Sequence, residues 1–186
     1  SGKTSLMEAI LYYTGATDRL GKVEDGTTIS DYDVEEKKRK VSISTSVALC
    51  KWKDVKINLV DTPGYFDFVG EMIEGLNAVD MAMIAVCGVS GIEVGTEKAW
   101  EYAEKKRLPR AFFINKLDRE NSNFEKVLNQ IKDKFGMSVV PIQYPIGSEN
   151  NFKGVINVIS KRARLFNSKT KKMEDAEIPV ELMDKI

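Results

Sequence analysis

Two apolar runs, residues 81–86 and 111–114, constrain the fold more than any other feature of the chain. The first reads Met-Ala-Met-Ile-Ala-Val and the second Ala-Phe-Phe-Ile, so both faces of each run are apolar. A strand that is apolar on both faces is typical of a parallel sheet covered by helices. A helix is expected between them, over residues 96–106, and this alternation predicts an α/β fold with a mainly parallel sheet.

The rest of the chain continues the alternation. A helix is expected to begin at Lys3 and to stop at Gly15, because glycine favours a helix end. Residues 16–40 are polar, punctuated by glycine and then heavily charged, which predicts a long, mobile surface segment. The other expected elements are strands over residues 41–52, 55–60, 139–142, 154–159 and 164–166, helices over residues 69–76, 124–135 and from Val180, and turns over residues 53–54 and 168–172.

Composition narrows the class of protein. Lys plus Arg and Asp plus Glu number 28 each, so no global positive field favours nucleic acid, and we expect no binding to DNA. Cys50 and Cys87 lack CxxC spacing and the chain has no histidine, which argues against zinc and against a disulfide framework. No apolar run approaches the roughly 18 residues of a membrane span, and no signal peptide is evident. We therefore expect a cytoplasmic protein that does not bind membranes.

The first motif with chemical meaning is Gly-Lys-Thr at residues 2–4, where the first helix begins. Backbone amides and the helix dipole at such a position attract phosphate oxygens, and Lys3 adds a positive charge. The hydroxyl of Thr4 would hold magnesium. Taken alone, the motif is weak, and a solvated helix start explains it better.

Two further motifs each follow an apolar strand. Asp-Thr-Pro-Gly at residues 61–64 places Asp61 where a carboxylate can reach magnesium through water, while Gly64 can turn its amide to a terminal phosphate. An ordinary turn is the alternative for this motif alone. Asn-Lys-Leu-Asp at residues 115–118 is more specific. The carboxylate of Asp118 can accept both the ring N–H and the exocyclic amine of guanine, and adenine lacks that donor pair. In this order, the three motifs predict a guanine-nucleotide site.

The chain resembles the elongation factor G family in residues 38–43, 61–64 and 115–119, and the resemblance covers nearly all of it. The family implies a P-loop NTPase-type fold, with three α/β/α layers and a mainly parallel sheet, followed by the start of a small inserted α+β subdomain. It implies that GTP or GDP is bound with Mg²⁺, and that the metal is held by Thr4, Ser42 and Asp61. The implied nucleotide-binding residues are Gly2, Lys3, Thr4, Ser5, Asp61, Gly64, Asn115, Lys116 and Asp118.

The same resemblance implies a function. Residues 16–44 would form a first switch and residues 61–75 a second, and GTP would be hydrolysed on the ribosome to drive translocation during protein synthesis. The ribosome, through its RNA and its proteins, would be the partner of the full-length protein. Two alternatives remain open: a GTP-dependent ribosome-binding module with slow or absent hydrolysis, and a GTPase of the ribosomal protection or release-factor type.

The chain departs from the family pattern at its first switch. Where the family usually has Arg-Gly-Ile-Thr, residues 39–42 read Arg-Lys-Val-Ser. Ser42 keeps the hydroxyl that magnesium needs, but a bulky cation replaces the glycine.

A second departure concerns the residue after the 61–64 motif. The family usually has a histidine that orients the attacking water, and this chain has Tyr65. Tyr65 and Gly64 are the candidate catalytic residues. Phosphoryl transfer depends mainly on positioning and electrostatics, so we expect a changed rate or a changed dependence on a partner. Packing of Tyr65 beside Phe66 and Phe68 is the alternative explanation of this tyrosine.

The expected domain division places the GTP-binding domain at residues 1–147 and the beginning of the inserted subdomain at residues 148–186. Because the strand and glycine expected before Ser1 are absent, we expect an incomplete domain that lacks its first strand. Unpaired strand edges would then favour self-association and leave this fragment inactive by itself.

Overall fold

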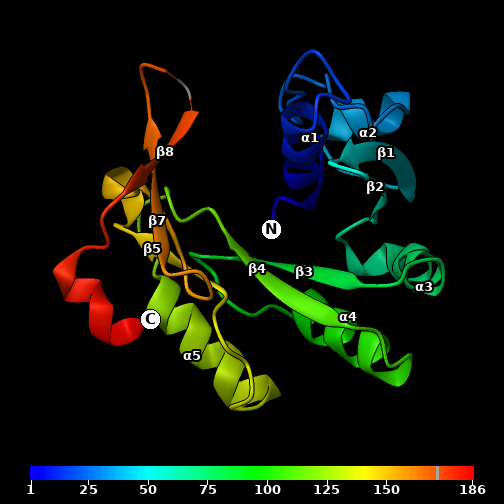
Figure 1. The fold of residues 1–186 in the computed structure, drawn as a ribbon. Helices are drawn as coiled ribbons and strands as arrows, with labels where there is room; N and C mark the ends of the chain where they lie inside the picture. Colours follow the sequence, from blue (N-terminus) through cyan, green and yellow to red (C-terminus); the bar gives the residue numbers. More distant parts are fainter. Residues whose placement is uncertain (171) are drawn as a thin grey trace. The chain divides into compact units, whose positions relative to one another are not determined.

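The computed structural model describes residues 1–170 and 172–186, with every side chain in these ranges except that of Phe66. Figure 1 shows the course of the chain. The residues form two compact units. The first unit comprises residues 1–86 and 93–113, and the second comprises residues 87–92 and 114–186.

The first unit begins with a helix packed on a hairpin. Helix α1, Lys3–Tyr13, covers the antiparallel strands β1, Ser46–Trp52, and β2, Val55–Asp61. Their shared core contains Met7, Leu11 and Cys50. Lys53, between the strands, has a φ of 52°, which allows the chain to reverse in two residues. The predicted helix and the predicted turn are both confirmed.

The segment between α1 and β1 contains a short helix, α2, Val34–Arg39. Asp33 caps its start, and the buried side chain of Glu36 completes a capping box. Glu36 Oε1 also accepts from the backbone N–H groups of Ile43 and Ser44, at 2.9 and 3.1 Å. Helix α2 was not predicted within the segment expected to be mobile surface, because polar side chains with backbone partners build structure without apolar periodicity. Because these two amides bind Glu36, they are not free to pair with another strand. Strand β1 accordingly begins at Ser46 and not at residue 41 as predicted.

The next elements along the chain, which lie wholly or mostly in the first unit, follow the predicted alternation. They are the 3₁₀ turn η1, Phe66–Phe68, helix α3, Val69–Asn77, strand β3, Ala82–Cys87, helix α4, Val94–Lys105, and strand β4, Arg110–Asn115. Trp100 of α4 stacks on Phe112 of β4 with 5.2 Å between ring centroids. This contact packs the helix on the strand, as amphipathic α/β packing requires.

Strands β3 and β4 pair with each other. The Ala82 N–H donates to the Pro109 carbonyl and the Gly88 N–H to the Asn115 carbonyl, at 2.9 and 2.7 Å. The sequence offset is the same for both bonds, which is the register of parallel strands. The predicted parallel sheet is confirmed for this pair only, because the other two described sheets are antiparallel.

The second unit contains helix α5 and a four-stranded antiparallel sheet in the order β5-β6-β7-β8. Its core holds Tyr144, Ile146, Ile156 and Ala163, all of them buried. The bounds are α5, Phe124–Phe135, β5, Gln143–Ile146, η2, Glu149–Asn151, β6, Gly154–Asn157, β7, Arg162–Asn167, β8, Lys172–Ala176, and η3, Val180–Lys185. Helix α5 has the predicted bounds, and the strands expected over 154–159 and 164–166 are found as β6 and β7.

Two features of this sheet differ from expectation. The strand predicted over residues 139–142 is wrong, since Val140 is 70% exposed and Pro141 has no N–H to donate, and the strand lies at β5 instead. Strand β8 was not predicted, because its mostly polar sequence shows no alternation, yet it pairs with β7 along its length. The turn predicted over residues 168–172 includes residue 171, which lies outside the described residues.

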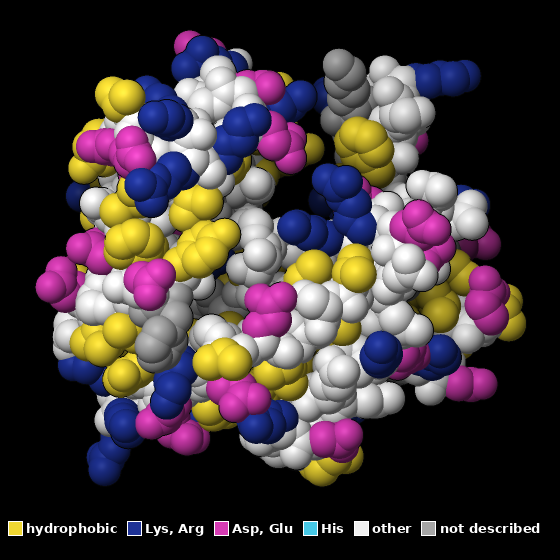
Figure 2. Space-filling model, turned by 180° about the vertical axis from the view of Figure 1, so that it is seen from behind, with side chains coloured by type: hydrophobic (Ala, Val, Ile, Leu, Met, Phe, Trp, Pro, Cys, Tyr) yellow, Lys and Arg dark blue, Asp and Glu magenta, His cyan; other side chains and the backbone are white. Residues whose placement is uncertain are grey.

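Among the described residues, no helix has the length and apolar character needed to cross a lipid bilayer. On the face drawn in Figure 2, Lys and Arg side chains are interspersed with Asp and Glu side chains. This mixture on the visible face agrees with the equal numbers of both charges in the sequence.

Candidate functional site

Four polar side chains from distant parts of the sequence meet at the start of helix α1. Thr4 Oγ1 donates to Asp61 Oδ2 at 2.6 Å, and Thr4 Oγ1 and Ser42 Oγ lie 3.1 Å apart. Ser42 Oγ donates to Asp31 Oδ1 at 2.7 Å. We call Thr4, Asp31, Ser42 and Asp61 the hydroxyl–carboxylate group. It brings together three predicted site residues and Asp31, which sequence reasoning missed because it lies in the segment expected to be mobile surface.

The local course of the chain explains this meeting. Gly2 has a φ of 86°, which glycine adopts without strain, and the chain turns there directly into α1. Thr4 thus lies in the first turn of α1, and Asp61 is the last residue of β2. The N-cap residue is glycine, which has no side chain to cap this turn, and Ser5 in the turn is exposed. The amides of the first turn and the helix dipole therefore suit an anion.

Lys3 lies beside the 61–64 motif. Burial lowers the pKa of Lys3 from its ordinary value, although the charges of Asp61 and Glu93 act in the opposite direction. A Cβ atom on Gly64 would lie 2.8 Å from Lys3 Nζ, so the amino group of Lys3 lies close to the backbone of Gly64. A bound anion would favour the charged form of this lysine, which burial disfavours.

Burial also disfavours the charged form of Asp61, whose pKa is shifted upward rather than downward. Burial raises the pKa of Asp61, and nearby Asp31 adds to the rise, whereas the hydrogen bond from Thr4 and the charge of Lys3 lower it. A hard divalent cation binds carboxylate and hydroxyl oxygens and would favour the ionised carboxylates. The residues of the hydroxyl–carboxylate group therefore fit a magnesium ion.

Tyr65 directly follows Gly64 and is 59% exposed. Its backbone carbonyl accepts from the N–H of Phe68 at 3.1 Å, which begins the η1 turn. The side chain of Phe66 lies outside the described part, so the aromatic packing considered for Tyr65 stays untested. The exposed phenol can accept and donate hydrogen bonds to a ligand or to water.

The other predicted residues lie in the second unit, in the loop over residues 115–122. Asn115 Oδ1 accepts from the Lys116 N–H at 2.8 Å, and Lys116 has a φ of 60°. Ser122 Oγ donates to the carbonyl of Leu117 at 2.8 Å. The side chains of Lys116 and Asp118 are exposed. Hydrogen bonds between side chains and the backbone hold this 115–122 loop, and the side chains of Lys116 and Asp118 are open to solvent.

Two contacts from outside the motif support the 115–122 loop, and sequence reasoning missed both. The Gly88 N–H donates to the Asn115 carbonyl, and a Cβ atom on Gly88 would lie 2.9 Å from Leu117 Cδ2. The Glu149 N–H donates to the Leu117 carbonyl at 2.7 Å, and Glu149 Oε1 accepts from the Asn121 N–H at 2.7 Å. A glycine just after an apolar strand was the available signal for Gly88, whereas no local pattern marks Glu149.

Residues 1–183 match the family model described as the elongation factor Tu GTP binding domain. The chain belongs to this family. Its fold is accordingly the P-loop α/β fold, and GTP binding is the property by which the family is described. The predicted fold class is confirmed at this level.

Individual relatives of this GTP-binding domain agree with the family match. Elongation factor G of Wolbachia pipientis subsp. Culex pipiens (strain wPip) is 41% identical over 187 residues, which cover 100% of this chain and 27% of that protein. The crystal structure of ttk003000868 from Thermus thermophilus is similar with a TM-score of 0.92 and 38% identity, over 99% of this chain and 27% of that one. The predicted resemblance to elongation factor G is therefore confirmed, and the chain spans about a quarter of the length of these relatives.

Proposed function

We propose that this GTP-binding domain binds GTP and GDP with Mg²⁺, and that the full-length protein hydrolyses GTP on the ribosome as a translational GTPase of the elongation factor G type. The observation that carries the proposal is the meeting of Thr4, Ser42 and Asp61 beside the buried Lys3. These are an oxygen-donor set and a cation of the kind that phosphates with magnesium require. Translocation during protein synthesis is the step that the similarity to elongation factor G supports.

In this proposal Thr4, Ser42 and Asp61 hold the metal. The ion would neutralise phosphate charge as the terminal phosphate departs. Lys3 and the first-turn amides near Gly2 and Ser5 bind the phosphate oxygens, since the N-cap Gly2 has no side chain to occupy these amides.

Gly64 and Tyr65 are the proposed catalytic residues. The close approach of Gly64 to Lys3 supports a role for its amide at the terminal phosphate. Tyr65 would orient the attacking water through its phenol, which is exposed. A phenol is a weaker base than an imidazole at neutral pH, so positioning by a partner contributes more than it would with histidine.

Asn115, Lys116 and Asp118 are the proposed base-binding residues. Asp118 accepts the two donors of guanine, and the backbone-held 115–122 loop keeps it in place. Adenine would leave the carboxylate without partners, which explains a preference for guanine.

The finer architecture belongs to the same proposal. We assign residues 1–147 to a three-layer α/β/α GTP-binding domain with a mainly parallel sheet, and residues 148–186 to the beginning of an inserted α+β subdomain. The parallel pair β3–β4 with its connecting helix supports the first assignment. The antiparallel sheet supports the second, although β5 precedes the proposed boundary. A cytoplasmic location and ribosomal RNA and proteins as partners follow from a role in translation.

The test is GTP hydrolysis by the full-length protein, with and without ribosomes, in the wild type and in Tyr65→His. Tyr13→His is the matched control, because Tyr13 is also exposed, at 67%, but lies at the far end of α1. We expect ribosomes to stimulate the wild type strongly. Binding of GTP without stimulated hydrolysis, restored by Tyr65→His and not by Tyr13→His, would instead favour a nucleotide-dependent ribosome-binding module, the alternative that Tyr65 supports.

A further inference from the structure

Thr45, which directly follows the proposed first switch (residues 16–44), forms hydrogen bonds with helix α3. The Thr45 backbone N–H donates to Glu71 Oε2 at 2.6 Å, and Thr45 Oγ1 donates to the Glu71 backbone carbonyl at 3.1 Å. One residue of α3 thus accepts both polar hydrogens of Thr45. Neither residue belongs to a motif that the sequence singled out.

The surrounding packing is close. A Cβ atom on Gly75, one turn further along α3, would lie 2.6 Å from Thr62 Cγ2 and 3.9 Å from Thr45 Cγ2. The helix therefore lies against both Thr45 and the 61–64 motif, and only glycine at this position permits the approach. Hydrogen bonding from Thr45, first of all from its backbone N–H, lowers the pKa of the Glu71 carboxyl, so this carboxylate is ionised at neutral pH and accepts strongly.

The position of Thr45 gives this contact a functional meaning. Ser42, a proposed metal ligand, precedes it by three residues, which span at most about 10 Å even when extended. Helix α3 begins shortly after the proposed catalytic residue Tyr65. Most of α3 lies in the proposed second switch, residues 61–75. Hydrogen bonds between Thr45 and α3 therefore limit how far the end of the first switch can move independently of the second.

We propose that Glu71 is a positioning residue that fastens the end of the first switch to helix α3, so that both switches respond together to the terminal phosphate. The inference rests on the proposed function, because it concerns the same nucleotide site. Breaking the fastening would leave Ser42 less restrained. Binding of GTP, which uses the switches, would then weaken more than binding of GDP.

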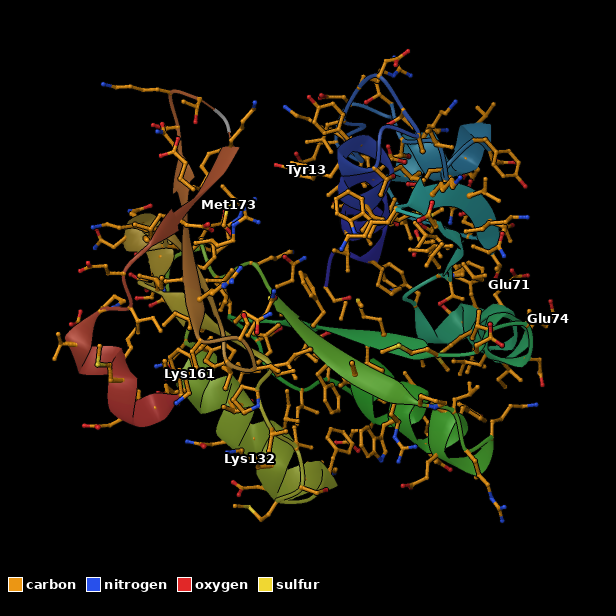
Figure 3. The ribbon with its side chains drawn as sticks, viewed as in Figure 1. Tyr13, Glu71, Glu74, Lys132, Lys161 and Met173 are labelled. Atoms are coloured by element: carbon orange, nitrogen blue, oxygen red, sulfur yellow. The ribbon has the colours of Figure 1, made fainter. Side chains whose placement is uncertain are left out.

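Helix α3 supplies its own control. Glu74 lies on the same helix and is exposed, and among the described residues it makes no hydrogen bond or ion pair. Figure 3 shows both carboxylates extending from α3. Glu71→Ala removes the acceptor, Glu71→Gln keeps an oxygen that can accept from the Thr45 N–H, and Glu74→Ala removes a carboxylate without touching Thr45.

The experiment uses the full-length protein and measures dissociation constants for GDP and for a slowly hydrolysed GTP analogue, together with hydrogen exchange at the Thr45 amide. In Glu71→Ala we expect the exchange to quicken and the affinity for the GTP analogue to fall, each on the order of tenfold, with GDP affinity changed less than about twofold. Glu71→Gln and Glu74→Ala should stay near the wild type.

Equal losses of GDP and GTP-analogue affinity in Glu71→Ala would show a merely structural role and overturn the proposal. So would unchanged exchange at Thr45, or an effect of Glu74→Ala as large as that of Glu71→Ala. A wild type that binds neither nucleotide would overturn the proposed function itself. A wild type that binds both, with Glu71→Ala indistinguishable from it, would overturn only the coupling.

Discussion

The hydroxyl–carboxylate group and the 115–122 loop are built in different ways. In the former, side chains from four separate segments bind one another, and Thr4, Asp31 and Asp61 are buried. In the latter, hydrogen bonds that involve the backbone fix the loop, while Lys116 and Asp118 remain exposed.

The proposed function accounts for the difference, because it assigns phosphate and metal to the first part and the guanine base to the second. Phosphate and metal are recognised by charge, which is strongest where water is excluded, and the cost appears as the shifted pKa values of Lys3 and Asp61. A base is recognised by the direction of its hydrogen bonds, which a rigid backbone sets at little electrostatic cost. Substitutions in the two places should therefore change different properties.

The largest effect is expected for Asp61→Asn. Loss of the buried charge that we propose as a metal ligand should cost about 3 kcal/mol, or roughly 100-fold in magnesium-dependent affinity for GDP. Without nucleotide, the variant should be at least as stable as the wild type at neutral pH, because it no longer buries an ionised carboxyl. Titration with and without Mg²⁺ measures the first effect, and thermal unfolding measures the second. Asp54→Asn, in the exposed turn of the hairpin, is the control.

The stability of Asp61→Asn also has a pH signature. Since burial raises the pKa of Asp61 above its unfolded value, the wild type gains stability as pH falls through the raised pKa and loses it as pH rises. The asparagine variant lacks this pH-dependent contribution to the free energy of unfolding. A wild type whose stability relative to the variant rises with pH would contradict the assignment.

A change of base specificity is expected for Asp118→Asn. An asparagine cannot accept both donors of guanine, so GDP affinity should fall about 10- to 100-fold, while dependence on Mg²⁺ stays as in the wild type. Competition between GDP and xanthosine diphosphate checks this, because the new amide can donate to the extra carbonyl of xanthine. Glu120→Gln is a matched control in the same loop, since Glu120 is exposed. Altered metal dependence in Asp118→Asn would break the distinction between the two regions.

A smaller loss is expected for Gly88→Ala. Its Cβ atom would lie 2.9 Å from Leu117 Cδ2 and 3.0 Å from the Asn115 carbonyl, so the 115–122 loop must shift. Overpacking of this kind costs about 1 to 2 kcal/mol, and GDP affinity should fall about tenfold. Gly70→Ala is the control, because nothing lies within 4 Å of its Cβ position. Equal GDP affinity of the two variants would show that the loop tolerates displacement.

The smallest effect on nucleotide binding is expected for Tyr144→Phe, in the sheet of the second unit. Burial, and then the hydrogen bond to Glu125, raise the pKa of Tyr144 to about 12. The stabilisation is present below the unfolded pKa near 10 and is lost as pH rises through about 12. The variant should lose about 1 kcal/mol of unfolding free energy at neutral pH and bind GDP as the wild type does. Denaturant unfolding between pH 8 and about 12 checks the pH dependence.

Several parts of the fold could be predicted because their signals are local. Helices α1 and α5, the hairpin turn and strands β3 and β4 have periodicity or turn residues within their own segments. Strand β8 and helix α2 could not be predicted in this way. The first needs the edge of β7 as a partner. The second lacks apolar periodicity, and its one local signal is the capping box of Asp33 and Glu36.

The same division holds for the candidate site. The sequence by itself determined Lys3, Asp61 and Asp118, because each lies in a short motif at the end of a strand or the start of a helix, where the chemistry can be read from neighbouring residues. Only the tertiary structure decided that Asp31, Glu71 and Glu149 take part. No local motif marks these carboxylates, and the partners that tie them to the site are 11 or more positions away in the sequence. A long-range hydrogen bond leaves no periodicity in the chain, so folding alone reveals it.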